Sequence, residues 1–181
     1  VHSMKDLPTK LPAGLTIGAV CEREYPGDVL ISKNGEKLDE LKKGARIGTS
    51  SLRRRAQLLY YRPDFQIVDL RGNLTTRLRK LRETDLDAIV LAYAGIKRLG
   101  YENLITQLIP FSICLPAIGQ GSIGVEIRAD DTVTKKLVAG IDHEQSKLAI
   151  MAERAFLRRL EGGCQVPIGA LGRVENNMLF L

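Results

Sequence analysis

The chain has 181 residues, of which 44% are hydrophobic, so it is long enough and apolar enough to bury a sizeable core. No apolar run is long enough to cross a membrane, and nothing at the start reads as a signal peptide, so membrane-spanning and secreted classes are not expected. A formal net charge of +6 implies an anionic partner, either nucleic acid, an anionic membrane or a polyacidic small molecule.

Short apolar runs alternate with helical patterns along the chain. The runs that predict strands are Leu15–Val20, Val29–Ser32, Ala45–Gly48, Ile67–Leu70, Ala88–Ala92 and Gly124–Ile127. Apolar residues at helical spacing predict helices at about residues 51–61, 74–84, 131–140 and 144–160. This alternation is typical of α/β layers with a mainly parallel sheet.

The first of these helices carries an unusual run of charge. Ser50 is a candidate N-cap, and Leu52, Ala56 and Leu59 share one face of the helix that follows. Arg53, Arg54 and Arg55 fall in the first turn, where the helix dipole already makes the potential positive. A bound anion would relieve this repulsion, although a solvated run of charge on a helix face is the alternative interpretation.

More arginines follow the next strands. Arg71 lies at the end of a strand, before Gly72-Asn73, where α/β folds place their ligands. In the helix after it, Leu74, Leu78 and Leu81 form the buried stripe. Arg77 lies beside this stripe and can point into a cleft, whereas Arg79 lies on the opposite, solvated side. Lys97 and Arg98 add charge after the strand that ends at Ala92.

The cysteines and histidines argue against a metal site or a disulfide framework. Cys21, Cys114 and Cys164 are odd in number, widely spaced and without a Cys-x-x-Cys pair, which favours a reducing compartment. His2 and His143 have no metal-ligand partner at helical spacing, so we predict no metal.

Cys164 has a distinctive position among the cysteines. Leu148, Ala152, Phe156 and Leu160 form one apolar stripe at helical spacing, and Gly162-Gly163 then ends the helix. Cys164 is therefore expected in a loop that presents it and does not bury it. A lone cysteine of this kind is either an inert small hydrophobe or a nucleophile.

Several segments together closely resemble the porphobilinogen deaminase family, also called hydroxymethylbilane synthases, over nearly the whole chain. These segments are His2-Ser3-Met4-Lys5-Asp6, Gly48 to Arg54, Leu70-Arg71-Gly72-Asn73, Thr76-Arg77-Leu78, Leu115 to Gly121 and Glu161 to Pro167. The resemblance implies an α/β fold with two periplasmic-binding-protein-like lobes, the first incomplete, and a partial α+β C-terminal domain. It assigns residues 1–24 and 116–141 to the first lobe, 25–115 to the second lobe and 142–181 to the cofactor-attachment domain.

The resemblance also implies roles for individual residues. Cys164 carries a covalent dipyrromethane cofactor through a thioether. The residues implied to bind the cofactor are Lys5, Ser51, Arg53, Arg54, Arg71 and Arg77. Those implied to bind substrate are Ser3, Arg98 and Gln120. Arginine suits both tasks because its planar fork binds carboxylates bidentately. The segment Leu115 to Gly121 is interpreted as a hinge crossing between lobes, or only as a turn.

Asp6 would pass for a surface aspartate or a helix cap on composition alone, and the resemblance makes it the catalytic carboxylate. The implied enzyme is a cytoplasmic transferase of tetrapyrrole (heme) biosynthesis that joins four porphobilinogen molecules head to tail, releasing ammonia and then hydroxymethylbilane. The family is expected to be monomeric, with no nucleic-acid or membrane partner. Two alternatives remain, an anionic-ligand binding module, which leaves Cys164 unused, and a nucleic-acid binding module, which fits poorly with 5% aromatic residues.

The chain begins with Val1 inside a recognisable motif and is interpreted as a fragment that lacks part of the first lobe and the C-terminal end. The apolar strand faces of residues 1–24 and 116–141 would then lack a partner sheet, a condition that favours association or local disorder. The 181-residue polypeptide alone is therefore expected to be inactive, to carry little or no cofactor, and to self-associate or have mobile first-lobe remnants.

Overall fold

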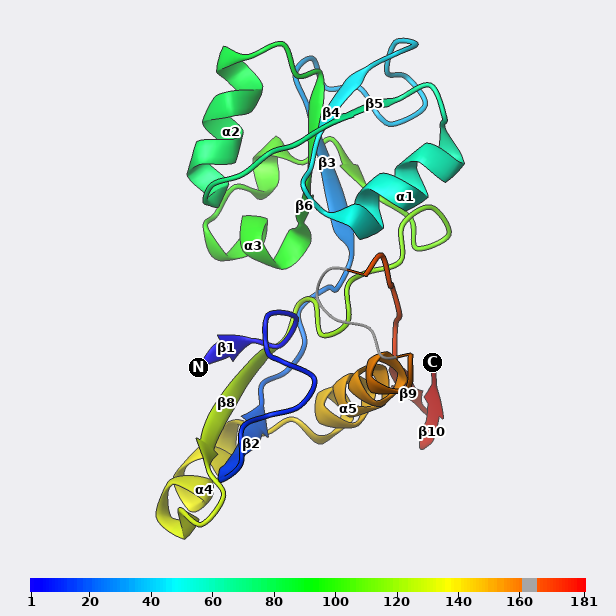
Figure 1. Cartoon of the computed structure of the whole chain (residues 1–181). Coiled ribbons are helices and arrows are strands. Elements are labelled where there is room, and N and C mark those ends of the chain that lie inside the picture. The colour runs from blue at the N-terminus through cyan, green and yellow to red at the C-terminus, as the bar shows by residue number, and fades with distance from the viewer. Residues whose placement is uncertain (161–165) are drawn as a thin grey trace. The chain divides into compact units, whose positions relative to one another are not determined.

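The structure is a computed structural model that describes residues 1–160 and 166–181 (Figure 1). Its strands are β1 (His2–Ser3), β2 (Leu15–Val20), β3 (Asp28–Ser32), β4 (Arg46–Gly48), β5 (Gln66–Val68), β6 (Ala88–Ala92), β7 (Gln107–Leu108), β8 (Ile123–Arg128), β9 (Arg173–Glu175) and β10 (Met178–Phe180). Its helices are α1 (Leu52–Tyr61), α2 (Leu74–Glu83), α3 (Tyr93–Arg98), α4 (Thr132–Val138) and α5 (Glu144–Arg159), with two 3-10 helices, η1 (Glu102–Leu104) and η2 (Ala139–Ile141). No described helix is long and apolar enough to span a membrane.

The chain divides into two compact units. Unit 1 consists of Val1–Pro26 and Pro116–Leu181, and unit 2 consists of Gly27–Leu115. The C-terminal residues from 142 onward thus lie in the same unit as the first residues of the chain.

Unit 2 is built on a five-stranded sheet with the order β5-β4-β6-β3-β7. Strand β4 pairs in parallel with β5 and with β6, and the helices α1 and α2 make the crossovers that parallel pairing requires. Strand β3 runs antiparallel to both β6 and β7. The predicted α/β fold class is confirmed.

Both faces of the unit 2 sheet are covered by helices, because its central strands are apolar on both sides. On one face, Leu30 of β3 belongs to the same core cluster as Leu58 of α1. On the other face, Val29 of β3 clusters with Leu78 of α2 and Ile96 of α3. Helix α1 therefore covers one face while α2 and α3 cover the other (Figure 1).

Unit 1 corrects the prediction of a mainly parallel sheet. Its sheet has the order β1-β8-β2, with both pairings antiparallel, and β9 and β10 form an antiparallel hairpin. Within the residues that the structure describes, parallel pairing is confined to β4, β5 and β6. The alternation pattern gave the wrong strand direction because β2 and β3 are neighbours in the sequence but belong to different units. Strand β2 instead pairs with β8, which follows unit 2 in the sequence.

Helix α5 packs through a face that carries charged residues. Its apolar stripe is not its buried face, since Leu148, Phe156 and Leu160 are 49%, 37% and 51% exposed. The residues that α5 buries are Ser146, Ala149, Ile150, Glu153 and Arg154. The helix ends at Arg159 with Leu160 as its C-cap, in agreement with the predicted helix over about residues 144–160. Tertiary hydrogen bonds of Glu153 and Arg154 therefore decide which face is buried, and hydropathy alone does not.

Candidate functional site

The carboxyl ends of β4, β5 and β6 gather at one edge of the unit 2 sheet, because these strands are mutually parallel. Helix α1 starts beyond β4 with Ser51 as its N-cap, whose hydroxyl accepts from the Arg54 amide at 3.5 Å. The predicted N-cap, Ser50, is wrong, because its hydroxyl instead accepts from the Leu70 amide at 2.9 Å. Helix α2 starts beyond β5 with Asn73 as its N-cap.

Two of the three consecutive arginines on α1 converge on one buried carboxylate. The Nη2 atoms of Arg53 and Arg54 lie 2.8 and 2.7 Å from the two oxygens of Asp28, whose side chain is 0% exposed. Asp28 begins β3 and pairs in register with Ala92 at the carboxyl end of β6, so it reaches the same edge of the sheet. Both arginines are buried as well.

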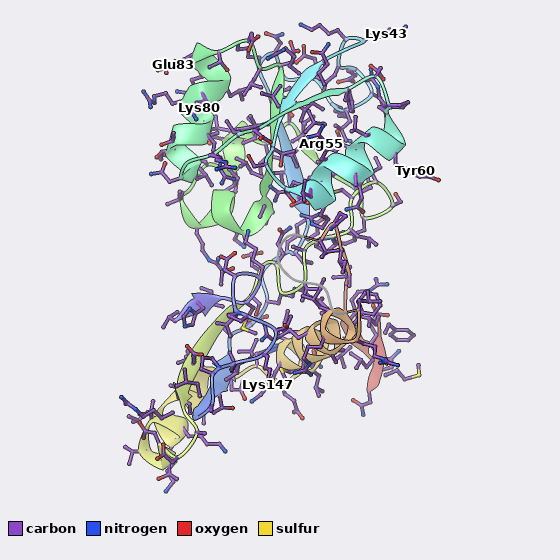
Figure 2. All side chains as sticks on the ribbon, in the orientation of Figure 1. Lys43, Arg55, Tyr60, Lys80, Glu83 and Lys147 are labelled. Atoms are coloured by element: carbon purple, nitrogen blue, oxygen red, sulfur yellow. The ribbon has the colours of Figure 1, made fainter. Side chains whose placement is uncertain are left out.

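This cluster corrects one of the two interpretations of the arginine run, the solvated run of charge, while the binding of a ligand anion stays a prediction. Arg53 and Arg54 are not a solvated charge run, and the anion that relieves their mutual repulsion is Asp28 of the same chain. The predicted face of Leu52, Ala56 and Leu59 is not the most buried one, because Leu52 is 51% exposed and Ala56 is exposed as well. Arg55 is exposed, and Tyr60 near the end of the same helix projects outward (Figure 2).

The Nη1 atom of each arginine donates to a backbone oxygen. Nη1 of Arg54 donates to the carbonyl of Val90 at 3.0 Å, and Nη1 of Arg53 donates to the carbonyl of Leu115. Within residues 1–160 and 166–181, neither Nε atom has a hydrogen-bond partner. Burial lowers the pKa of Arg54, but the charge and hydrogen bond of Asp28 outweigh burial, so the pKa is raised. The cluster therefore carries two positive charges against one negative charge.

Arg77 adds a further positive charge near this cluster. Its Nε donates to the Gly72 carbonyl at 2.8 Å, and burial together with the charge of Arg54 lowers its pKa. An anion bound near these two like charges would offset their repulsion. The predicted contrast with Arg79 is confirmed, because Arg77 is half-buried while the Arg79 side chain is 65% exposed.

The other predicted arginines of unit 2 are exposed. Arg71 lies between β5 and α2, and its carbonyl accepts from Nζ of Lys80 at 3.2 Å. Arg98 is the last residue of the short helix α3. Their side chains are free to reach a ligand in solution, and their roles stay predictions.

The predicted residues of unit 1 lie in and around a turn that follows β1. The amide of Asp6 donates to the carbonyl of Ser3 at 3.0 Å. Asp6 is exposed and Lys5 is half-buried. Gln120 is 1% exposed, and its amide donates to the Pro26 carbonyl at 2.6 Å. The substrate-binding role of Gln120 stays a prediction.

Cys164 lies outside the described residues. Among the other two cysteines, Cys114 is 0% exposed, and burial, followed by the nearby charge of Asp28, raises the pKa of its thiol to about 12. Cys114 is thus held as an unreactive thiol at neutral pH, because the thiolate is the nucleophilic form.

Sequence reasoning did not identify Asp28, because it reads as the boundary of an apolar strand. It also did not identify Glu153 and Arg154, which are 0% and 2% exposed in α5. The only signal for Glu153 and Arg154 in the sequence was their helical spacing from the apolar residue Ile150, with which they share the buried face of α5.

The fold and these residues define an α/β protein that concentrates arginines at the carboxyl ends of parallel strands. The chain belongs to the porphobilinogen deaminase family. Residues 1–136 match the family model described as the porphobilinogen deaminase, dipyromethane cofactor binding domain, and residues 147–181 match that of the porphobilinogen deaminase C-terminal domain.

Curated relatives agree with this assignment. The chain is 69% identical to a porphobilinogen deaminase of Pelotomaculum thermopropionicum and 67% identical to one of Carboxydothermus hydrogenoformans, each over 100% of this chain and 58% of the relative. The chain thus spans a little over half the length of the curated relatives it matches.

The solved structures matched by this chain include a YaeC family lipoprotein of Enterococcus faecalis, with a TM-score of 0.45, 14% identity and coverage of 71% of this chain and 62% of that one. Another is the second substrate binding domain of a putative amino acid ABC transporter of Streptococcus pneumoniae, with a TM-score of 0.44, 13% identity and coverage of 89% of this chain and 64% of that one.

Proposed function

We propose that the full-length protein carrying this chain is a hydroxymethylbilane synthase, which joins four porphobilinogen molecules head to tail on a dipyrromethane primer. Family membership supports the reaction class. The observation that carries the proposal is the excess of positive charge at the carboxyl ends of β4, β5 and β6, where Arg53 and Arg54 share one buried carboxylate and Arg77 lies near Arg54.

Such an arrangement suits a ligand rich in carboxylates. Porphobilinogen and the pyrrole chain grown from it carry acetate and propionate groups, which guanidinium groups bind through paired hydrogen bonds. Lys5, Ser51, Arg53, Arg54, Arg71 and Arg77 are proposed to hold the primer, and Ser3, Arg98 and Gln120 to contact the substrate. The helix N-termini at Ser51 and Asn73 add positive potential at the same edge of the sheet.

The proposed chemistry assigns Asp6 the charge-stabilising role. Porphobilinogen loses ammonia as its aminomethyl C–N bond breaks, which leaves a cationic azafulvene. The free α-carbon of the terminal pyrrole attacks the exocyclic methylene carbon, a C–C bond forms, and the α-proton then leaves. A carboxylate beside the pyrrole nitrogens stabilises the positive charge and accepts and returns protons. Asp6 is suited to this task because its side chain is exposed from a turn whose backbone is fixed by hydrogen bonds.

The primer supplies the nucleophilic pyrrole carbon, and Cys164 is proposed as its attachment point through a thioether. Residues 142–181 would then be part of the cofactor-attachment domain, with α5 leading toward the cysteine. The unreactive state of the buried Cys114 thiol supports this choice among the cysteines. A cytoplasmic location fits the free thiols of Cys21 and Cys114.

The mass of the full-length protein tests this proposal. We expect the intact mass to exceed the sequence mass by two linked pyrrole units, and Cys164→Ser to abolish the increment because a hydroxyl cannot form the thioether. Cys21→Ser is the matched control and should keep the increment.

An adduct that persists in Cys164→Ser, or that maps to Cys21 or Cys114, would refute the attachment site. A protein that carries no pyrrole but binds arbitrary nucleic acid with a steep dependence on salt would instead support the nucleic-acid module.

A further inference from the structure

Helix α5 buries two adjacent charged residues, Glu153 and Arg154, which are 0% and 2% exposed. Burying charged groups is costly unless hydrogen bonds and opposite charge satisfy them. Both side chains form hydrogen bonds mainly with backbone groups of unit 1. The pair therefore fixes segments of the chain that form no continuous secondary structure.

Arg154 holds the segment directly after Asp6. Its Nη1 donates to the Leu7 carbonyl at 3.1 Å, and its Nη2 donates to the carbonyls of Pro8 and, at 3.4 Å, Thr9. Residues 7–9 belong to neither a helix nor a strand, so they lack the repeated hydrogen bonds of those elements. One planar guanidinium with its fork of donors thus satisfies three consecutive carbonyls.

The same face of α5 holds the residue before Lys5. Ile150, one turn before Arg154, clusters with Met4, which is 1% exposed. The Met4 amide also donates to the Ser122 carbonyl at 2.9 Å. The Lys5-Asp6 dipeptide is therefore bracketed by Ile150 on one side and by Arg154 on the other.

Glu153 strengthens this bracket from a second direction. Its oxygens accept from the amides of Gly119 and Gly172 at 2.7 and 2.8 Å and from Nη1 of Arg23 at 2.6 Å. Gly119 has a φ of +74°, and a Cβ there would lie 2.8 Å from the Met4 carbonyl carbon and 3.0 Å from the Lys5 nitrogen. Glu153 thus fixes a glycine whose backbone packs directly against the Met4–Lys5 peptide.

We propose that Arg154 is a positioning residue for the reaction, which sets the backbone on which Asp6 is presented. This inference rests on the proposed function, because it gives Arg154 a role only through the carboxylate of Asp6. It makes α5 a shared support, since the helix that precedes Cys164 in the sequence also holds the segment that follows Asp6.

Substitution of Arg154 in the cofactor-loaded full-length protein tests the proposal. Arg154→Met and Arg154→Lys should both lower kcat per loaded molecule by roughly ten- to hundredfold, because small misplacement of a reacting group has effects of that size. The KM should change far less than kcat, because Arg154 does not hold the substrate's carboxylates. Arg154→Lys keeps the charge and covers the case in which Arg154→Met does not fold. Arg158→Met, an exposed arginine on the same helix, is the matched control and should leave both constants unchanged.

A double-mutant cycle with Asp6→Asn separates positioning from support of the fold. If Arg154 acts through Asp6, then Asp6→Asn/Arg154→Lys should turn over no more slowly than Asp6→Asn alone. Wild-type kcat in Arg154→Lys, or losses that simply multiply in the double variant, would overturn the positioning role. Near-normal turnover by Asp6→Asn alone is a separate outcome, because it would contradict the catalytic role proposed for Asp6 and not only the positioning role of Arg154.

Discussion

Asp6→Asn in the full-length protein should lower kcat by about a hundredfold or more, because loss of a charged group that acts in the transition state costs on the order of 3 kcal/mol. The amide keeps the shape of the carboxylate, and the turn is held by backbone groups, so the fold should be unaffected. Single-turnover and steady-state assays with porphobilinogen give kcat, and intact mass reports whether the cofactor is still carried.

Asp130→Asn is a suitable control for this experiment, because Asp130 is an exposed aspartate of the same unit. It should leave turnover unchanged. Should Asp6→Asn turn over at a rate near that of the control, the catalytic role assigned to Asp6 is wrong. Should Asp6→Asn instead lack the cofactor mass increment, Asp6 would be needed for primer assembly and its role in elongation would require a preloaded protein.

Much of the fold could be predicted because local patterns determine it. The expected bounds of the strands at Leu15–Val20 and Ala88–Ala92 agree with β2 and β6, since each is a short, mainly apolar run of strand length. The stripe of Leu74, Leu78 and Leu81 on α2 is likewise confirmed, because a simple amphipathic helix follows its hydropathy. The strand directions in unit 1 were not predictable, because β2 and β8 pair although all of unit 2 lies between them in the sequence.

The candidate site was predicted less completely, because its polar contacts join residues far apart in the sequence. No feature of the sequence around Arg53 indicates that its partner is Asp28, which lies 25 residues earlier in the chain. Likewise, Arg154 meets the carbonyl of Leu7, which lies 147 residues away. In both cases a charged residue that reads as exposed is buried because a distant segment supplies its hydrogen bonds, and helical periodicity contains no information about that segment.

Asp28→Asn should strongly destabilise unit 2. It leaves the buried guanidinium groups of Arg53 and Arg54 without a counter-charge, and breaking a buried ion pair in this way costs about 3–5 kcal/mol in the free energy of unfolding. Asp85→Asn is the control, because Asp85 pairs with Arg46 at 3.1 Å while 73% exposed, and such pairs contribute about 0–1 kcal/mol. Denaturant unfolding of each variant measures the difference.

A triple variant then separates the stabilising role of the cluster from its binding role. Asp28→Leu with Arg53→Met and Arg54→Met replaces the whole buried ion group by apolar side chains, which is often neutral or stabilising. This variant should recover much of the stability that Asp28→Asn loses, yet it should fail to assemble the dipyrromethane primer because two carboxylate-binding arginines are gone. Unfolding of Asp28→Asn at the same denaturant midpoint as Asp85→Asn would contradict the energetic argument. Normal primer assembly in the stable triple variant would show that Arg53 and Arg54 serve the fold alone, and the proposed binding role would then rest on Arg71, Arg77 and Arg98.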